Sequence, residues 1–310
     1  MAGSPRCGEP SKPRCRKRPC STSFSVTPRA PPPVDVLVPL GAQVGPALLD
    51  ACRPRLVQQF GVGLQGVDLE AARRRNIAVA NVPAADTGNA AAVAELAMLH
   101  LLALLRHWGQ AAQAAVEQRR VGSPMGAMLA SRTVAVLGVG AIGTHVITRL
   151  RAFEAEPVGV GRRDLDAVPN VAALLDAQHY HQVDDLAVAL RRSDALLVCC
   201  PLTEHTRGLV GAGALNALPA GGFLVNVGRG PVVDRDALLA ALRSGHLAGA
   251  GLDVAWTEPI DPDDELLAHN VTVTPHIGGV TQESYAAMAS AFAANIGHHA
   301  NGELYAYRTV

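Results

Sequence analysis

Thr133-Val-Ala-Val-Leu137, followed at once by Gly138-Val-Gly140-Ala-Ile-Gly143, is the stretch that decides the fold. The first five residues form a short apolar run typical of a buried strand, and the residues after Gly143 have a helical pattern. Glycines at this spacing allow a tight turn, close approach to a pyrophosphate, and close helix–strand packing. The free N–H groups at the helix start can then hold the phosphates. We therefore predict that a dinucleotide binds at Gly138, Gly140, Ala141, Ile142 and Gly143; an ordinary glycine-rich turn is the alternative.

Strand and helix patterns alternate on both sides of this segment. Apolar strand patterns occur at 34–38, 55–59 and 77–80, and again near Val158, Ala195, Phe223, Gly249 and Val271. Strands that alternate with helices predict parallel sheets with crossover helices. We predict an α/β protein with a Rossmann-type, doubly wound parallel sheet in a nucleotide domain at 90–280. A smaller substrate domain would combine 34–89 with 281–310, where a helical pattern returns the chain.

Composition excludes several classes of function. The 310 residues carry 27 Lys and Arg against 27 Asp and Glu, so no global field favours nucleic acid or a membrane surface. The longest apolar run, 90–105, is interrupted by Glu95 and His100 and is shorter than the roughly 20 residues that a bilayer span needs. The six cysteines have no metal-ligand spacing, and Cys199 and Cys200 end an apolar strand. We expect a soluble protein without a metal site.

Residues 1–33 differ from the rest of the chain. They hold seven basic residues and one acid, with frequent Ser, Thr and Pro. Such a segment cannot form a packed core, so we predict a disordered basic leader. Its composition is also that of an organelle transit peptide, which leaves cytosol, plastid and mitochondrion open as locations. A solvated extension or a misassigned start is the alternative.

The residues after the second strand of the nucleotide domain bear on the choice of cofactor. An acid near Gly161 would normally bond the ribose 2′-hydroxyl, but the sequence reads Gly161-Arg162-Arg163. A guanidinium can bind a 2′-phosphate in a bidentate manner. We predict contacts from Arg162 and Arg163 and a preference for NADP(H). Asp164 keeps NAD(H) possible, and both arginines could instead be solvated loop charges.

Three polar residues follow three further strands. Arg229 lies in Asn226-Val-Gly-Arg-Gly, Glu258 precedes Pro259, and His276 lies in Thr274-Pro-His-Ile-Gly. Parallel α/β sheets bind ligands beyond the carboxyl ends of their strands. An Arg, a Glu and a His that converge there suit hydride transfer, although each could be a loop charge, a turn acid or a strand-end histidine. We expect His179, His181, His298 and His299 to lie at the surface.

Together these motifs resemble the D-isomer-specific 2-hydroxyacid dehydrogenase family, which includes glyoxylate/hydroxypyruvate reductases and phosphoglycerate dehydrogenases. The resemblance covers roughly residues 55–305. It includes Gly61-Val-Gly63 with Val67-Asp68, Ala94-Glu95, the glycine loop, Pro201-Leu-Thr203 with Thr206, and the three catalytic segments. The pattern is most similar to plant-type members. It implies a flavodoxin-like substrate domain and NAD(P)H-dependent reduction of a small 2-oxo acid.

The resemblance also implies a role for each matching residue. Arg229 would bind the substrate carboxylate, His276 would protonate the carbonyl oxygen, and Glu258 would orient the imidazole and stabilise its charged form. The backbone of Val62 and Gly63 would face the carboxylate. Further cofactor contacts would come from Pro201, Thr206, Val227, Gly228, Asp253, Gly278 and Gly279.

The front of the chain departs from the family pattern. Only 34–59 stands where the family has about three strands with their helices, so the smaller domain would lack two strands and have an exposed parallel edge. A nucleotide-sensing adaptor of the same fold and an unstable, truncated product are therefore alternatives to an enzyme. Helix 90–106 is apolar on nearly all sides and must be covered, so we predict a homodimer through about 90–130.

Overall fold

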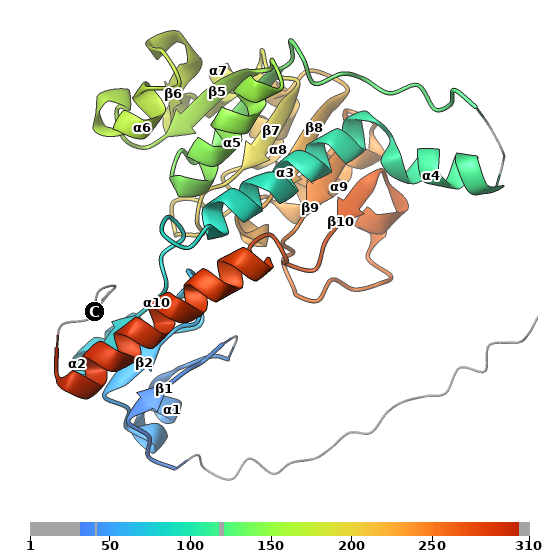
Figure 1. The fold of residues 1–310 in the computed structure, drawn as a ribbon. Helices are drawn as coiled ribbons and strands as arrows, with labels where there is room; N and C mark the ends of the chain where they lie inside the picture. Colours follow the sequence, from blue (N-terminus) through green and yellow to red (C-terminus); the bar gives the residue numbers. More distant parts are fainter. Residues whose placement is uncertain (1–31, 41, 118–120, 304–310) are drawn as a thin grey trace, which may run out of the picture.

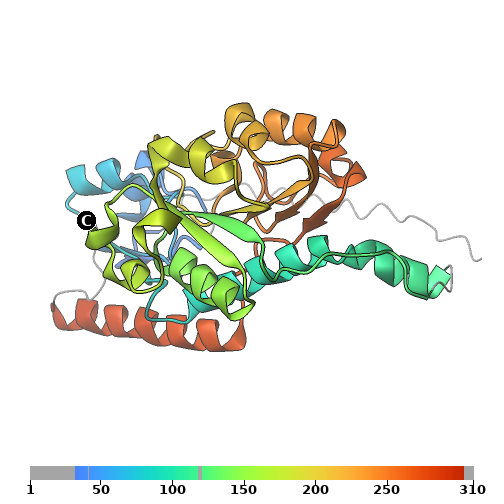
Figure 2. The same ribbon diagram turned by 90° about the horizontal axis from the view of Figure 1, so that it is seen from above.

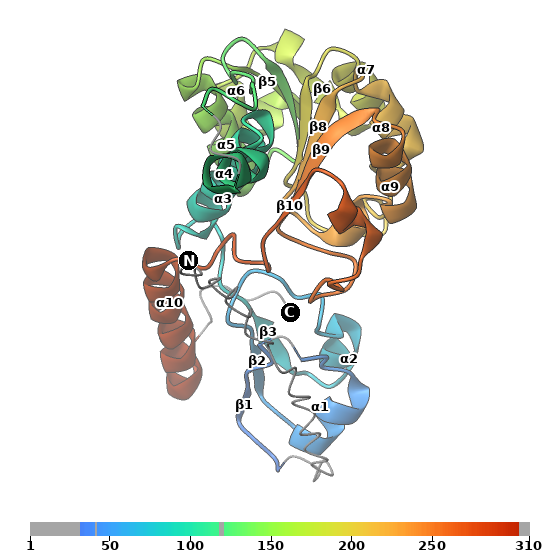
Figure 3. The same cartoon turned by 90° about the vertical axis from the view of Figure 1, so that its right-hand side faces the viewer.

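Two parallel sheets form the framework of the chain in the computed structural model, which describes residues 32–40, 42–117 and 121–303 (Figure 1). The larger sheet has seven strands and the smaller sheet has three. Seen from the side, the two sheets lie one above the other, and helix α10 runs along the smaller one (Figure 3). The α/β class and the parallel sheet predicted from the sequence are confirmed.

The larger sheet is doubly wound. Its strand order is β10-β9-β8-β7-β4-β5-β6, so the order reverses on the two sides of β4. The bounds are β4 Thr133–Leu137, β5 Glu156–Gly161, β6 Tyr180–Gln182, β7 Ala195–Val198, β8 Gly222–Asn226, β9 Leu247–Leu252 and β10 Val271–Val273. The five strands expected after residue 150 are confirmed as β5, β7, β8, β9 and β10, whereas β6 was not predicted.

Helices cover both faces of this sheet because successive side chains of a buried strand point to opposite sides. In β4, Val134 and Val136 join the core beneath α3 and α5, and Ala135 and Leu137 join the core beneath α7, α8 and α9. The helix bounds are α3 Asn89–Leu105, α5 Ala141–Ala152, α6 Pro169–Ala172, α7 Leu186–Leu190, α8 Ala212–Ala217 and α9 Arg235–Arg243. The buried run 90–105 is thus a core helix, α3.

The smaller sheet has the order β1-β2-β3 and forms from the front of the chain. Its elements are β1 Val36–Leu37, α1 Pro46–Cys52, β2 Leu56–Gln58, α2 Leu69–Arg74 and β3 Ala78–Ala80. β1 is an edge strand, as expected if the preceding strands are absent. β2 pairs with β1 and with β3, in parallel in both cases.

The C-terminal helix α10, Gln282–Asn301, packs on this smaller sheet. The buried amide of Asn295 donates to Gln58 Oε1 at 3.0 Å. His299 is buried as well, and its Nε2 lies 2.8 Å from Asp35 Oδ2. The prediction that His299 lies at the surface is therefore wrong, because the helix faces the sheet through this histidine. The domain boundaries themselves stay a prediction, and most of the basic leader lies outside the described residues.

Helix α4, Trp108–Glu117, follows α3 and extends away from the body of the molecule (Figures 1 and 2). In the described part of the chain, no single helix is long and apolar enough to cross a membrane. α3 and α4 taken together, with a bend of 57° between them, reach that length and composition.

The third glycine of the loop gives a test of how the larger sheet packs. A Cβ on Gly143 would lie 2.0 Å from the carbonyl oxygen of Gly138, so Gly143→Ala must separate α5 from β4. We expect a loss of a few kcal/mol of unfolding free energy, as for other overpacked cores.

The matched control is Gly297→Ala, at an exposed position inside α10 with nothing within 4 Å of the new methyl group. This change should stabilise the protein by up to about 1 kcal/mol, because alanine favours a helix. Denaturant unfolding of both variants measures the difference. Equal stability of the two variants would contradict the packing described.

Candidate functional site

The glycine loop has the geometry that a diphosphate requires. Gly138 has φ +95, a left-handed conformation that favours glycine, and a Cβ there would overlap the backbone of Cys200. Beside Gly140 a Cβ would meet no protein atom within 4 Å, so the backbone is open to the groove that this residue lines. The first turn of α5, with Ala141 and Ile142, presents N–H groups that lack intrahelical acceptors. The loop therefore fits the phosphates of a dinucleotide.

Six of the predicted nucleotide residues line one groove of about 350 Å³, namely Gly138, Gly140, Arg162, Arg163, Pro201 and Thr206, whereas Val227, Asp253 and Gly279 line a separate pocket. The glycine loop forms one wall, Pro201 and Thr206 form another, and Arg162 and Arg163 lie at the end of β5. Both arginines are exposed, and neither guanidinium pairs with a carboxylate of the described residues. Asp164 instead accepts a hydrogen bond from Gln182 Nε2 at 2.8 Å. The arrangement leaves both guanidinium groups without a carboxylate partner, among the described residues, at this end of the groove.

The side chain of Thr206 holds the backbone that forms one wall of the groove. Its buried hydroxyl donates to the carbonyl oxygen of Pro201 at 2.7 Å and accepts from the backbone N–H of Thr203 at 2.7 Å. These two bonds fold the segment after β7 into a compact turn. The predicted cofactor contact of Thr206 stays a prediction, but its hydroxyl is already engaged within the protein.

The three predicted catalytic residues lie close to one another at the carboxyl edge of the sheet. Nδ1 of His276 lies 2.7 Å from Glu258 Oε2, and the other oxygen of Glu258 accepts from the backbone N–H of Ala255 at 3.1 Å. Glu258 is thus held by the backbone and in turn fixes the imidazole, whose Nε2 remains available. The side chains of His276 and Glu258 are 44% and 41% exposed, so a ligand can reach them.

Arg229 is half-buried opposite this pair. The buried side chain of Asn226 accepts from the Gly228 backbone at 3.1 Å and donates to the Arg229 carbonyl at 3.0 Å, which fixes the turn after β8. Burial lowers the pKa of Arg229, and the nearby carboxylates of Glu258 and Asp253 oppose that effect. A half-buried cation of this kind favours an anionic ligand, because little water competes for the charge.

Asp253 holds the His276 loop in place. Its Oδ1 accepts from the Thr274 hydroxyl at 2.7 Å and from the Ile277 N–H at 2.8 Å, and its Oδ2 accepts from the Gly278 N–H at 2.9 Å. Its backbone carbonyl accepts from the N–H of His276 at 2.8 Å. His276 has φ 55, a left-handed conformation that costs a non-glycine residue about 1–2 kcal/mol. The contacts of Asp253 offset this cost.

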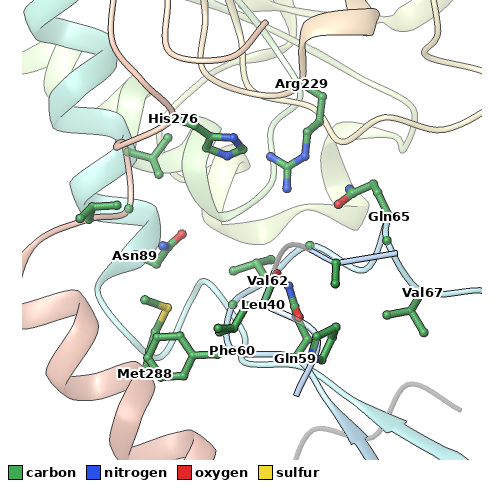
Figure 4. A pocket seen from close by; sticks show the side chains of 18 of the residues that line it. Leu40, Gln59, Phe60, Val62, Gln65, Val67, Asn89, Arg229, His276 and Met288 are labelled. Atoms are coloured by element: carbon green, nitrogen blue, oxygen red, sulfur yellow. Dashed lines mark hydrogen bonds between the residues drawn. The ribbon is translucent and has the colours of Figure 1, made fainter. Parts of the chain in front are cut away.

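Arg229 and His276 line a pocket of about 330 Å³ between the two sheets (Figure 4). Asp253, Val227 and Gly279 also line it from the larger sheet, and Val62 and Gly63 line it from the smaller one. A Cβ on Gly63 would lie 2.6 Å from Nη2 of Arg229, so the loop passes directly against the guanidinium. The residues predicted to bind substrate thus come together from both sheets.

Several pocket residues were not predicted from the sequence. In Figure 4, Gln65 extends toward Arg229 and Asn89 extends toward His276, and an apolar floor lies below them. This floor comprises Leu40, Phe60 and Met288, and Tyr285 also lines the pocket. Gln65 lies within the recognised segment 61–68 and Asn89 begins α3, so both could have been found by position. The contribution of α10 depends on tertiary packing, which no local pattern reveals.

The chain is similar to proteins of known family. The profile described as "D-isomer specific 2-hydroxyacid dehydrogenase, NAD binding domain" matches residues 98–278. A glyoxylate/hydroxypyruvate reductase of Arabidopsis thaliana is 36% identical over 250 residues, which cover 80% of this chain and 76% of the relative. A glyoxylate reductase of Aeropyrum pernix is 35% identical over 272 residues, which cover 83% of this chain and 76% of the relative.

Solved structures agree with these sequence matches. The NADPH-dependent glyoxylate/hydroxypyruvate reductase of Sinorhizobium meliloti, crystallised with NADP and malonate, superposes with a TM-score of 0.76 at 31% identity. The match covers 89% of this chain and 83% of that chain. A protein of Thermus thermophilus gives a TM-score of 0.78 at 31% identity, covering 89% of this chain and 85% of its own.

Cys200 gives a test of the groove wall. Burial raises the pKa of this thiol to about 11, and the positive charge of Arg162 opposes part of the shift. A raised pKa means that the reactive thiolate forms only at high pH, so about one Cys200 thiol in a thousand is ionised at pH 8. Burial raises the pKa of the neighbouring Cys199 as well.

We expect iodoacetamide at pH 8 to leave the peptide with Cys199 and Cys200 unmodified in the folded protein, as measured by mass spectrometry. Unfolding in guanidinium should restore alkylation at both positions, which controls for the accessibility of the reagent. Rapid alkylation of the native protein at pH 8 would contradict the buried wall.

Proposed function

Because this chain belongs to the D-isomer-specific 2-hydroxyacid dehydrogenase family, we propose that it reduces a small 2-oxo acid to the corresponding D-2-hydroxy acid. The family is one of NAD(P)-dependent oxidoreductases that act on CH–OH groups. One observation carries the proposal: His276, whose Nδ1 lies 2.7 Å from Glu258 Oε2, lines the same pocket as the half-buried Arg229. This combination supplies an anion site and a proton donor beside a groove that fits a dinucleotide.

Each residue then has a defined task. Arg229 would bind the carboxylate and hold the neighbouring carbonyl group in place. His276 would give the proton from Nε2 to the carbonyl oxygen, and Glu258 would keep the imidazole oriented and balance its positive charge. The nicotinamide cofactor, when bound, supplies the hydride to the carbonyl carbon. In the reverse direction His276 would take the proton from the hydroxyl group.

The lining of the pocket favours a substrate with a single carboxylate. Among the lining residues that the structure describes, only Arg229 and His276 can carry positive charge. A phosphate or a second carboxylate would therefore lack a partner. Amides of Gln59, Gln65 and Asn89 could bond a hydroxyl group on the substrate. We accordingly propose glyoxylate and hydroxypyruvate as substrates, as the names of the relatives in Arabidopsis and Aeropyrum also indicate.

An assay of cofactor oxidation with a panel of 2-oxo acids tests the proposed function. Glyoxylate or hydroxypyruvate should be reduced, and phosphohydroxypyruvate should react much more slowly. His276→Ala should lower kcat by roughly 10²–10⁴-fold, as expected when a general acid is removed.

His298→Ala is the matched control, because this histidine pairs with Glu303 at the far end of α10 and should leave kcat unchanged. Absence of turnover in the unaltered protein, or full turnover in His276→Ala, would refute the proposed function.

The choice of cofactor is a finer proposal. The two unpaired arginines after β5 favour a 2′-phosphate, so we propose that NADP(H) is preferred and that NAD(H) is also used. Arg162→Ala should weaken NADPH binding about tenfold or more, as expected for the loss of one charge-assisted hydrogen bond, and should leave NADH binding unchanged.

Binding of each cofactor, measured by fluorescence titration, provides the test. Arg192→Ala, which removes an exposed arginine beyond α7 that makes no contact with the described residues, should alter neither affinity. An equal loss of NADH and NADPH affinity in Arg162→Ala would rule out a 2′-phosphate contact.

Exposed apolar side chains in α3, in α4 and in the residues after α4 support a proposal of a homodimer through about 90–130. These side chains are large and close in sequence: Leu99, Trp108, Val116, Val121, Met125 and Met128. Contiguous exposed apolar surface is typical of an interface, and two-fold dimers are the commonest oligomers.

We expect light scattering to give about twice the mass of one 32.2 kDa chain. Val116→Lys, at a position that is 80% exposed in α4, should shift the protein toward the monomer. Val188→Lys, which charges an exposed valine in α7, should leave the mass unchanged. A monomeric parent protein would contradict the proposal.

A further inference from the structure

His100 is a buried, titratable side chain that the proposed mechanism does not use. It lies in the middle of α3, is 3% exposed, and faces the end of the larger sheet. The imidazole fits there because its neighbour in β9 is Gly251, where a Cβ would lie 2.7 Å from the Cβ of His100. Gly251 pairs with Thr272 of β10, so the ring lies over the junction of these two strands. Its polar atoms therefore need partners within the protein.

Both ring nitrogens have such a partner, one in β10 and one directly after it. Nδ1 lies 2.7 Å from the Thr272 hydroxyl and Nε2 lies 2.9 Å from the Thr274 hydroxyl. Residues two apart in a strand point to the same face, which lets one imidazole bridge both threonines. The imidazole of His100 thus bonds to two threonines, Thr272 in β10 and Thr274 directly after this strand.

The hydrogen-bond directions assign one tautomer. The Thr274 hydroxyl has a single hydrogen, and it is donated to Asp253 Oδ1 at 2.7 Å, since the carboxylate can only accept. The hydroxyl oxygen must then accept from His100, so Nε2 carries the proton. Nδ1 is left to accept from the Thr272 hydroxyl. Burial lowers the pKa of His100, although the carboxylate of Asp253 opposes the shift, and this agrees with a neutral ring.

The chain of bonds ends at the loop that carries His276. Asp253 accepts from the N–H groups of Ile277 and Gly278, and its carbonyl accepts from the N–H of His276. We infer that His100 is a positioning residue for the proposed reaction: through the Thr274 hydroxyl it orients the Asp253 carboxylate that holds the His276 loop. The inference rests on the proposed function only for its kinetic consequences.

Two matched substitutions separate this role from simple packing. Thr274→Val and Thr272→Val remove the same hydroxyl from the same strand, and each breaks one bond to His100. Thr274→Val should lower kcat about tenfold or more, the effect of one lost hydrogen bond to a charged group, with a smaller change in KM. Thr272→Val should leave kcat within about twofold, because its bond leads away from Asp253.

Substitutions of His100 test whether this residue acts through the Thr274 hydroxyl. His100→Leu should lower kcat, and His100→Gln, whose side-chain amide can donate to Thr274 in place of Nε2, should restore part of it. In the Thr274→Val background, His100→Leu should cause no further loss, since the connection is already broken. Equal effects of Thr272→Val and Thr274→Val, or independent losses in the double variant, would overturn the inference.

A second readout does not depend on turnover. Amide hydrogen exchange over residues 276–278 should be faster in Thr274→Val than in the parent protein and unchanged in Thr272→Val, because only the former loosens Asp253. His100→Leu should also speed exchange over these residues, so if the parent protein reduces no 2-oxo acid, the proposed function fails while exchange in His100→Leu still decides the role of His100. Unchanged exchange in Thr274→Val would overturn the inference whatever the activity.

Discussion

The carboxylate of Asp253 connects the ends of β9 and β10, and the arrangement of the site depends on it. It follows β9 directly and accepts hydrogen bonds from Thr274, Ile277 and Gly278. These bonds stabilise the left-handed backbone of His276. Without them the imidazole would lose the orientation in which Nδ1 bonds to Glu258. The site is thus a property of neighbouring strand ends, held by short bonds to one buried charge.

The same edge of the sheet explains why the two halves of the site lie together. Parallel strands direct all their carboxyl ends to one edge, and the reversal of strand order at β4 opens a crevice there. The glycine loop follows β4 and Arg229 follows β8, so the groove of the glycine loop and the pocket of Arg229 both lie beyond this edge of the sheet. The smaller sheet then covers this edge with the loop of Gly63 and with Phe60, whose ring packs edge-on against Tyr285 and Phe292 of α10.

Local patterns in the sequence predict most of the larger sheet and its polar strand ends. Arg229, Glu258 and His276 could be singled out because each lies in the segment after a strand, where side chains of a parallel sheet converge. Gln65, Asn89 and Met288 could not be assigned to the pocket in this way, because they reach it from different elements whose packing is long-range. His299 was misjudged for the same reason: its partner Asp35 is far away in sequence. The proposed role of Thr274 could not be predicted either, because a threonine hydroxyl can donate or accept in many directions and its partners, His100 and Asp253, come from other elements.

Transfer of deuterium from cofactor to product tests the central claim most directly. The purified protein would be given NADPH that carries deuterium at both positions of C4, with glyoxylate or hydroxypyruvate, and the product would be analysed by mass spectrometry and chiral chromatography. With hydroxypyruvate, the account predicts a D-2-hydroxy acid that carries one deuterium at C2, and loss of this product in His276→Ala. A product without deuterium, a product of L configuration, or equal formation by His276→Ala would contradict it.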